Sequence, residues 1–455
     1  MRIYDTLEGR VRDFAPLDGK AARMYVCGVT PYAEAHVGHA MQAIVFDVVR
    51  RHLEHRGYVV RHVQNFTDID DKLIDRANQE GAPVADLAER HIAAYFRLLE
   101  ALNVRPAHHY PRATEQTPQM LEIIGGLVAR GAAYAAAGDV YFRVTRAPGY
   151  GKLSRRSLEM MFAGARIEAN AQKEHPMDFA LWKAAKPGEP SWDSPWGPGR
   201  PGWHIECSAM ALNYLGRTLD IHGGGQDLVF PHHENEIAQS EAFNDGQPLA
   251  RFWMHNGMML LGQEKMSKSI GNLVTIADAL AAHSADALRH LILSSHYRSP
   301  VTYSDDLMAA SGRAVARLRQ ALAVSGGAGA ALDPDPHRAR FLDAMDDDFS
   351  TPQALAALFD LARAVNRAAA EGGDVQAAQE ALRTLGGEVI GFAFAEPQAA
   401  VDPGLARRIQ DLVDRRARLR AERRFAEADA IRDELAAMNV SLTDSPQGAV
   451  WQLTQ

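Results

Sequence analysis

The sequence predicts an α/β protein, with a doubly wound parallel sheet of the Rossmann-like type that carries an insertion and is followed by mostly α-helical C-terminal domains. Three observations support this fold class. Strand and helix patterns alternate through about the first 100 residues, a stretch dense in Gly, Pro and Trp interrupts them, and alanine-rich helical periodicity dominates beyond residue 268. At 455 residues the chain exceeds one ordinary core, so we expect roughly three domains of unequal size.

The first predicted unit is a strand, a helix and a second strand. The apolar run Met24–Val26 predicts the first strand, and apolar residues at helical spacing over 41–53 predict the helix, with Gly57 at the position of a C-terminal cap. The second strand is predicted over Tyr58–Val63. A right-handed crossover between these strands implies a parallel sheet, which binds ligands at the carboxyl ends of its strands.

The middle of the chain interrupts the sheet and then resumes it. The stretch Pro148–Trp203 is rich in Gly, Pro and Trp, which indicates an insertion. Leu219–Ile221 resembles a strand, three glycines follow it, and a helix is expected from about His232 to Phe243.

Two breaks divide the helical part. We expect Ser325–Gly329 with Pro334–Pro336 to form a flexible linker, and the segment near Pro397–Pro403 to separate a short final module. The predicted division is a catalytic domain over 1–270 with an insertion at about 105–200, a helical region over 271–325, a helical bundle over 337–395 and a small module over 402–455.

Composition excludes several classes of protein. Lys and Arg total 49 against 57 Asp and Glu, a formal charge of −8, so any site for a polyanion must be local. No run reaches the roughly 18 apolar residues of a membrane span, and the polar start Met1–Asp5 lacks a signal-peptide core, so we expect no membrane partner and a cytoplasmic location. The only two cysteines, Cys27 and Cys207, are by default buried bystanders.

His36-Val37-Gly38-His39 lies between the first strand and its helix. Backbone N–H groups and the helix dipole favour phosphate there, which makes these residues candidates for nucleotide binding. The alternative is a pair of helix-start histidines without a ligand.

Lys265-Met266-Ser267-Lys268-Ser269 places two ammonium groups on a loop of small residues. Such a loop can close over a triphosphate and neutralise the charge that develops on departing pyrophosphate. Taken by itself it could be a solvated loop.

His232 and Glu236 are four residues apart on a predicted helix, so both can reach one ion. Cys27 ends the first strand, and Cys207 could lie at the same edge of the sheet. Two sulfurs, a nitrogen and a carboxylate suit zinc. From spacing alone, metal binding and two buried thiols beside a charged helix face are about equally favoured.

The histidine motif and the lysine loop together resemble the two signatures of class I aminoacyl-tRNA synthetases. Within that class the chain resembles the cysteinyl-tRNA synthetase family over nearly its whole length. The further matching motifs are Cys27 before the histidine motif, Thr67–Lys72, Pro176–Lys183, Trp203–Cys207, His222–Gly225 with Asp227, His232–Glu236, and Pro446–Gly448 with Trp451.

This resemblance implies a role for each matching residue. It makes Cys27, Cys207, His232 and Glu236 the ligands of one zinc ion, which accepts the thiolate of the substrate and so selects cysteine over serine. It places Thr67, Trp203, His222 and Asp227 around the amino acid, although His222 could equally be a hydrogen-bonded histidine before a glycine turn. It assigns ATP, with Mg²⁺, to His36, Gly38, His39, Lys265, Ser267 and Lys268, of which His36, His39, Lys265 and Lys268 are catalytic.

Three positions depart from the family pattern. Val37 replaces the usual isoleucine, and Pro31 and Ala33 stand where Val and Asp are commoner. No phosphate-contacting histidine is lost. The missing carboxylate at Ala33 leaves open which residue contacts the amino group of the substrate.

The final module is rich in arginine. A salt-bridged, solvated helix is the usual interpretation of such a run, but its attachment to an ATP-dependent core favours binding of a polyanion. By resemblance this module reads the anticodon, the 271–325 region contacts the tRNA stem, and Arg432, Asp444 and Trp451 are candidates for base contacts. The arginines are Arg407, Arg408, Arg415, Arg416, Arg418, Arg420, Arg423 and Arg424.

The predicted activity joins cysteine to ATP, forming cysteinyl-adenylate and pyrophosphate, and then transfers cysteine to the terminal ribose of tRNA(Cys). The enzyme is expected to be a monomer. One alternative is the related ligase that joins cysteine to an amino-sugar inositol in mycothiol synthesis, and the arginine-rich module argues against it. The other is a non-catalytic RNA-binding paralogue, which would not need both nucleotide motifs.

Overall fold

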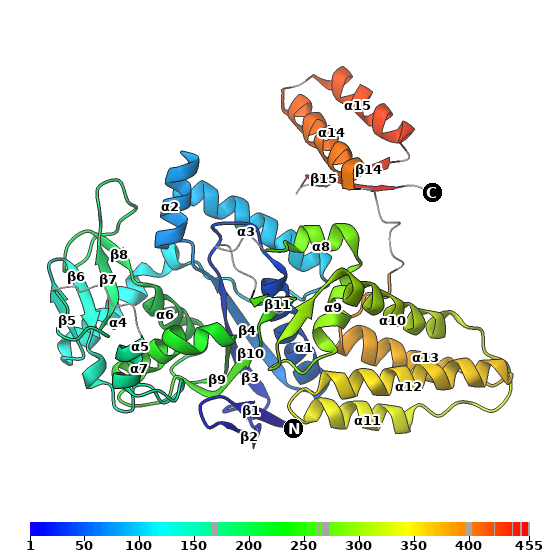
Figure 1. Ribbon diagram of the computed structural model, residues 1–455, viewed down its shortest axis with the longest axis horizontal. Coiled ribbons are helices and arrows are strands. Elements are labelled where there is room, and N and C mark those ends of the chain that lie inside the picture. Colours follow the sequence, from blue (N-terminus) through cyan, green and yellow to red (C-terminus); the bar gives the residue numbers. More distant parts are fainter. Residues whose placement is uncertain are drawn as a thin grey trace.

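The computed structural model describes residues 1–164, 172–262, 264–265, 273–395, 403–422, 424–438, 440–445 and 448–453. At its centre is a four-stranded sheet in the order β10-β9-β3-β4 (Figure 1). Every pairing in this sheet is parallel, so the predicted doubly wound α/β fold is confirmed. The bounds are β3 Ala21–Val29, β4 Val59–Phe66, β9 Leu219–Gly225 and β10 Ala250–Asn256.

Each of the three predicted strands is longer than expected. The second runs to Phe66 rather than Val63, and the glycines after Ile221 continue β9 instead of ending it. Position 223 of this strand requires glycine, because a Cβ there would come within 2.3 Å of the ring of Phe46. The sequence pattern could not show this packing requirement.

The sheet separates two hydrophobic cores, because side chains alternate between the faces of a strand. Met24 and Val26 of β3 face the first core, together with α1 (Val37–His55). Tyr25 and Cys27 face the second, where α6 (Trp203–Leu215) and α7 (Glu234–Phe243) pack. The cysteine therefore faces these two helices.

The predicted first helix is α1, which begins four residues earlier than its apolar pattern and ends at His55. Gly57 follows with φ +85°, a left-handed conformation that favours glycine, so the predicted C-terminal stop is confirmed. The remaining elements of this region are β1 Arg2–Asp5, β2 Arg10–Asp13, α2 Asp71–Glu80, α3 Val84–Ala101, β11 Met259–Leu261, β12 Glu264–Lys265, α8 Ile276–Ala282, α9 Ala285–Leu293 and β13 Val301–Tyr303.

The predicted insertion contains a sheet of its own. Its four strands pair antiparallel in the order β5-β6-β7-β8 and lie beside the parallel sheet (Figure 1). The bounds are α4 Thr117–Ala129, β5 Ala133–Ala136, β6 Asp139–Phe142, α5 Leu158–Gly164, β7 Phe179–Ala184 and β8 Gly199–Pro201.

Helices dominate the C-terminal part, as predicted. The helices α10 to α13 pack side by side, and their apolar residues continue the first core. The bounds are α10 Asp305–Ala323, α11 Asp335–Asp346, α12 Thr351–Ala370, α13 Gln376–Arg383, α14 Pro403–Ala421, α15 Phe425–Ala437, β14 Val440–Ser445 and β15 Gly448–Leu453. The last four elements enclose a small separate core that includes Ile409, Ile431 and Leu435.

The prediction of a flexible linker at Ser325–Gly329 is wrong. The backbone N–H groups of Gly327 and Gly329 donate to the carbonyls of Gly373 and Gly372, and residue 331 pairs with residue 374. The glycines are needed because a Cβ on Gly327 would lie 2.2 Å from the carbonyl oxygen of Gly372. A Gly-rich stretch is here an anchored loop rather than a spacer.

No helix among these described ranges is both long enough and apolar enough to cross a membrane.

Candidate metal centre and nucleotide site

The two cysteines meet although 180 residues separate them. Cys27 lies near the end of β3, and Cys207 lies on the second turn of α6. Their sulfur atoms are 3.6 Å apart, and both side chains are almost fully buried. Both are free thiols and do not form a disulfide.

His232 and Glu236 complete the predicted set. His232 lies in the π-helical turn η4 (Val229–His233), which leads into α7, and its Nε2 atom is 3.0 Å from Oε1 of Glu236. Oε1 is also 3.5 Å from the sulfur of Cys27. One donor atom from each of Cys27, Cys207, His232 and Glu236 lies within 4.8 Å of the others.

The distances between these donor atoms fit an ion with tetrahedral coordination. Sulfur ligands at about 2.3 Å from zinc are about 3.8 Å apart in a tetrahedron, close to the distance between the two sulfurs. The helical spacing of His232 and Glu236 does bring both side chains to one point, as predicted. The donor set and its geometry therefore fit a metal ion.

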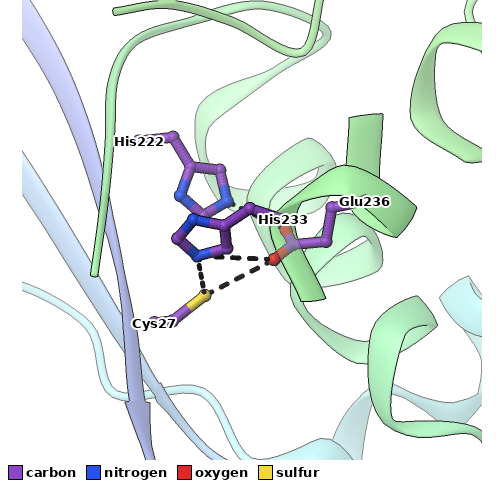
Figure 2. A group of neighbouring side chains, drawn as sticks. All are labelled: Cys27, His222, His233 and Glu236. Atoms are coloured by element: carbon purple, nitrogen blue, oxygen red, sulfur yellow. Dashed lines mark hydrogen bonds and ion pairs between the residues drawn. The ribbon is translucent and has the colours of Figure 1, made fainter. Parts of the chain in front are cut away.

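A second group of side chains shares two members with the first. Figure 2 shows Cys27, His222, His233 and Glu236, whose donor atoms also lie within 4.8 Å of one another. His222 Nε2 is 2.9 Å from Oε2 of Glu236, and His233 Nε2 is 3.2 Å from the sulfur of Cys27. Because this group has one sulfur fewer, the set with Cys207 suits zinc better.

Charges in the buried cluster compensate one another. Burial alone would raise the pKa of the Cys207 thiol, but its hydrogen bond with Cys27 and the neighbouring His232 lower this pKa to about 6. Burial would likewise lower the pKa of His232, but Glu236 and Cys207 raise it to about 10. His222 and His232 hold the pKa of Glu236 well below its usual range against the effect of burial. A thiolate, the form of cysteine that binds metal, is thus favoured at position 207.

Two predicted contacts of the amino acid lie beside this cluster. The indole of Trp203 stacks on the ring of His232, with centroids 4.3 Å apart, and its side chain remains 38% exposed. Thr67 is buried just beyond β4, where its hydroxyl accepts a hydrogen bond from Asn65. A cavity of about 220 Å³ opens next to Trp203, His204 and Glu206.

The other two lie in β9 and just beyond it. His222 is fully buried within the strand and stacks on Trp253, with ring centroids 4.5 Å apart. Its bond to Glu236 makes His222 a hydrogen-bonded histidine, which is one of the two interpretations given above, and connects it to a predicted metal ligand. Asp227 follows the strand in a short 3₁₀ turn, Gln226–Leu228, and is exposed.

The histidine motif forms the start of α1. His36 is the N-cap, its Nδ1 atom accepting from the backbone N–H of Gly38 at 3.2 Å, and Nδ1 of His39 accepts from the backbone N–H of His36 at 3.1 Å. Because both Nδ1 atoms accept, the proton of each neutral ring sits on Nε2. Both rings can therefore donate to a phosphate oxygen.

The lysine loop lies only partly within the described residues. Ser267 and Lys268 fall outside them, and of Lys265 only the backbone is described, as the end of β12. Beyond the loop, the backbone of residues 274–276 pairs with residues 35–37 of the histidine motif. The segment that follows the lysine loop is thus paired with the histidine motif.

The predicted tRNA contacts occupy the final module. Arg432 is exposed on α15, and Asp444 lies on β14, where only its backbone is described. Trp451 of β15 is partly buried against the small core, and its indole nitrogen donates to Gln410 at 3.1 Å. Trp451 therefore also contributes to the packing of the module.

Sequence reasoning missed several members of the buried cluster. A ring nitrogen of His204 lies 3.0 Å from one of His232, and His233 reaches both Cys27 and His255. The available signal was the density of histidines beside the predicted ligands. Nothing in the sequence pointed to Asn65 of β4, because its side chain contacts Gly28 of β3 and Cys207 of α6, which are distant in the chain.

The fold and this site define the class of the protein. Residues 13–313 match the family described as tRNA synthetases class I (C) catalytic domain, and residues 340–395 match the DALR domain. The solved structure of Mycobacterium tuberculosis methionyl-tRNA synthetase with methionyl-adenylate is similar over 82% of this chain and 92% of its own, with 17% identity and a TM-score of 0.62. At that identity the likeness concerns the fold alone.

The family within the class follows from closer relatives. Residues 402–451 match the cysteinyl-tRNA ligase anticodon binding domain. Proteins named cysteine–tRNA ligase are 52% identical in Dehalococcoides mccartyi and 50% identical in Geobacter sulfurreducens, each over 100% of this chain and 99% of the relative. This chain belongs to the cysteinyl-tRNA ligase family.

Proposed function

We propose that this protein attaches cysteine to its tRNA in two steps. The carboxylate of cysteine attacks the α-phosphorus of ATP, which forms cysteinyl-adenylate and releases pyrophosphate. A hydroxyl of the terminal ribose of tRNA then attacks the carbonyl carbon and releases AMP. The observation that carries this proposal is the buried cluster of two thiols, an imidazole and a carboxylate on a class I catalytic domain.

We propose that Cys27, Cys207, His232 and Glu236 hold one zinc ion. When bound, zinc supplies a soft acceptor for the thiolate of the substrate, which serine cannot offer with its hydroxyl. Glu236 is the hardest of the four ligands and is already hydrogen-bonded to His222, so it would yield a position most easily. Selection by sulfur would make a separate editing site unnecessary.

The nucleotide would bind at the start of α1. His36 and His39 would donate from Nε2 to the phosphates, and the backbone at Gly38 lies in the first turn, where the helix dipole favours anions. Lys265, Ser267 and Lys268 would close over the triphosphate, which binds with Mg²⁺. Support comes from the pairing of residues 274–276 with the histidine motif, and from a cavity of about 240 Å³ that His39 and Thr275 both line.

The amino acid would lie between the metal cluster and the nucleotide. Thr67, Trp203, His222 and Asp227 are the proposed contacts, and the first three lie in or beside the buried cluster. The family's usual carboxylate is absent at Ala33, which lines the cavity near His39. Glu206 is a buried carboxyl group at the cavity beside Trp203 and is another candidate for the amino group.

The tRNA would contact the final module through its arginines. The supporting observations are the arginine-rich helix α14 and the exposed position of Arg432. Relatives named cysteine–tRNA ligase imply tRNA(Cys) as the partner of this chain. We also propose that the enzyme acts as a monomer in the cytoplasm, and that its domains divide at the boundaries expected from the sequence.

Exchange of pyrophosphate into ATP tests the first step. We expect exchange to depend on cysteine and to be at background level with serine, because only cysteine offers sulfur to the metal. Acceptor assays with tRNA and with the amino-sugar inositol then separate this activity from the mycothiol-type ligase. Absence of exchange with cysteine would refute the enzymatic proposal, and transfer to the amino sugar alone would refute the assignment of the acceptor.

A further inference from the structure

We propose that Asn65 and Gln42 are positioning residues that clamp the peptide between Cys27 and Gly28, and thereby aim the thiol of Cys27 at the metal ion. This inference rests on the proposed metal site. The side chains of Asn65 and Gln42 would act through a ligand rather than bind the ion themselves.

The peptide in question lies in a bulge of β3. Val26 pairs with Gln64 of β4, and the next regular pair is Val29 with Phe66, so β3 has one residue more than its partner. A bulge leaves backbone groups outside the ladder and changes the direction of a side chain, and bulges are common beside active sites. Cys27 and Gly28 are the residues within this irregularity.

Two side-chain amides satisfy the displaced peptide. The N–H of Gly28 donates to Oδ1 of Asn65 at 2.8 Å, and the carbonyl of Cys27 accepts from Nε2 of Gln42 at 2.6 Å. Both groups belong to one peptide unit, so Asn65 of β4 and Gln42 of α1 hold it from opposite ends. A backbone group that is buried without a partner would be costly, which is why the bulge requires both.

Asn65 also reaches the other components of the site. It is 1% exposed, its amide nitrogen donates to the hydroxyl of Thr67 at 3.3 Å, and its oxygen is 3.7 Å from the sulfur of Cys207. The bond from Gly28 fixes the orientation of the amide, because a backbone N–H can only donate. One side chain therefore links both thiols to a proposed contact of the amino acid.

Gly28 is needed for this approach. A Cβ at that position would lie 1.6 Å from the backbone oxygen of Asn65, and a backbone atom cannot move aside without disturbing β4. Gln42 lies on α1 one turn after His39, so the clamp also joins the metal cluster to the helix that starts with the nucleotide motif.

The clamp predicts different effects for near-isosteric changes. Asn65→Asp keeps an acceptor for Gly28 but loses the donor to Thr67, whereas Gln42→Glu loses the donor to the carbonyl of Cys27. Asn65→Ala removes both functions of Asn65. We expect Asn65→Ala and Gln42→Glu to lower zinc affinity about 10- to 100-fold, and Asn65→Asp to raise KM for cysteine because the donor to Thr67 is lost.

The experiment measures zinc affinity of the full chain by competition with a chromophoric chelator, and KM for cysteine and for ATP by pyrophosphate exchange. Asn244→Asp is the matched control, because Asn244 is equally buried just after α7 and its side chain donates only to the carbonyl of Arg217 among the contacts described. We expect this control to keep wild-type zinc affinity. Thermal unfolding of the metal-free proteins shows whether each variant is folded.

Equal zinc affinity and equal KM for cysteine in wild type, Asn65→Ala and Gln42→Glu would overturn the clamp. An unchanged KM for cysteine in Asn65→Asp would also contradict it, because the donor to Thr67 would then not matter. A wild-type chain that binds no zinc would refute the metal site itself. A wild type that binds zinc, but no more tightly than the clamp variants, would instead refute the clamp and leave the metal site standing.

Discussion

Alternation along β3 decides which residues can reach the metal site. Tyr25 and Cys27 face α6 and α7, while Met24 and Val26 enter the opposite core. A shift of one residue in this strand would move the thiol of Cys27 to the wrong face. The identity of each ligand can therefore be tested at single positions.

Cys207→Ala should lose zinc and with it the preference for cysteine over serine, because one sulfur of a four-ligand set is gone. Lys268→Ala should keep zinc and slow the formation of the adenylate, because it removes a cation from the nucleotide loop. Metal analysis and pyrophosphate exchange measure both effects. Unchanged zinc content in Cys207→Ala would refute the ligand assignment.

His62 on β4 should make the protein sensitive to acid. Burial, with Arg50 and His108 nearby, lowers its pKa to about 3 in the folded protein. The unfolded chain has a histidine pKa of about 6.5, so the unfolded state binds more protons as pH falls, and stability is lost from about pH 6.5 downward. For this group alone the loss should be about 2 kcal/mol between pH 7.5 and pH 5.

The check compares His62→Leu with wild type in urea unfolding at those two pH values. The leucine variant should lose about 2 kcal/mol less than wild type on acidification, since all other groups contribute equally to both proteins. If both proteins lose the same free energy, the neutral state of His62 is refuted.

At the level of elements, the N-cap of α1 has one observed role and one proposed role. The ring of His36 caps the helix through Nδ1, which leaves the proton of a neutral ring on Nε2, the atom that we propose donates to a phosphate oxygen. Asparagine is a good N-cap residue, but it has no imidazole N–H to donate to a phosphate. Substitutions can therefore separate the observed helix cap from the proposed donation to phosphate.

His36→Ala should lower stability by about 1 kcal/mol and slow pyrophosphate exchange, because both the cap and the donor are lost. His36→Asn should restore the stability but not the exchange rate. Thermal unfolding and exchange kinetics measure the two effects separately. Wild-type exchange in His36→Asn would show that this residue only caps the helix.

At the scale of the whole molecule, a buried ion pair network joins the parallel sheet region to the helical bundle. Arg289 of α9 donates to Asp47 of α1 at 2.9 Å, and Asp47 also binds Arg51 at 2.8 Å. Arg289 further donates to the carbonyls of Leu102, Asn103 and Ile390. The guanidinium group of Arg289 therefore connects segments that lie far apart in the chain.

Arg289→Met should destabilise the protein by about 3 to 5 kcal/mol, because the buried carboxylate of Asp47 keeps only Arg51 and the backbone N–H of Arg105 as partners, and three carbonyls lose this donor. Urea unfolding measures the loss. The control is Arg383→Met, whose partner Glu380 is 3.4 Å away in an exposed pair that should contribute little. Equal stability of the two variants would contradict the importance of the network.

Local patterns were enough to predict much of the fold and several features of the site. The order of strands and helices, the stop at Gly57 and the shared face of His232 and Glu236 follow from spacing along the chain. The insertion and the helical C-terminal part were visible in composition. These features depend on neighbouring residues, so they are present in the sequence itself.

Contacts between distant segments could not be obtained in this way. The Gly-rich stretch at Ser325–Gly329 is anchored because residues 372–374 happen to lie beside it, and composition carries no information about that partner. Likewise, the histidines at 204, 233 and 255 became part of the site only through packing of α6, η4 and β10 around β3.

By itself, the sequence determined the fold class and its resemblance to the cysteinyl-tRNA synthetases, because motifs and periodicity are local. The tertiary structure alone decided that the two thiols lie 3.6 Å apart and that Asn65 and Gln42 hold the bulge beside one of them. The physical reason is that a metal site needs donor atoms at fixed distances, and only the packed sheet and helices can set those distances between residues 180 positions apart.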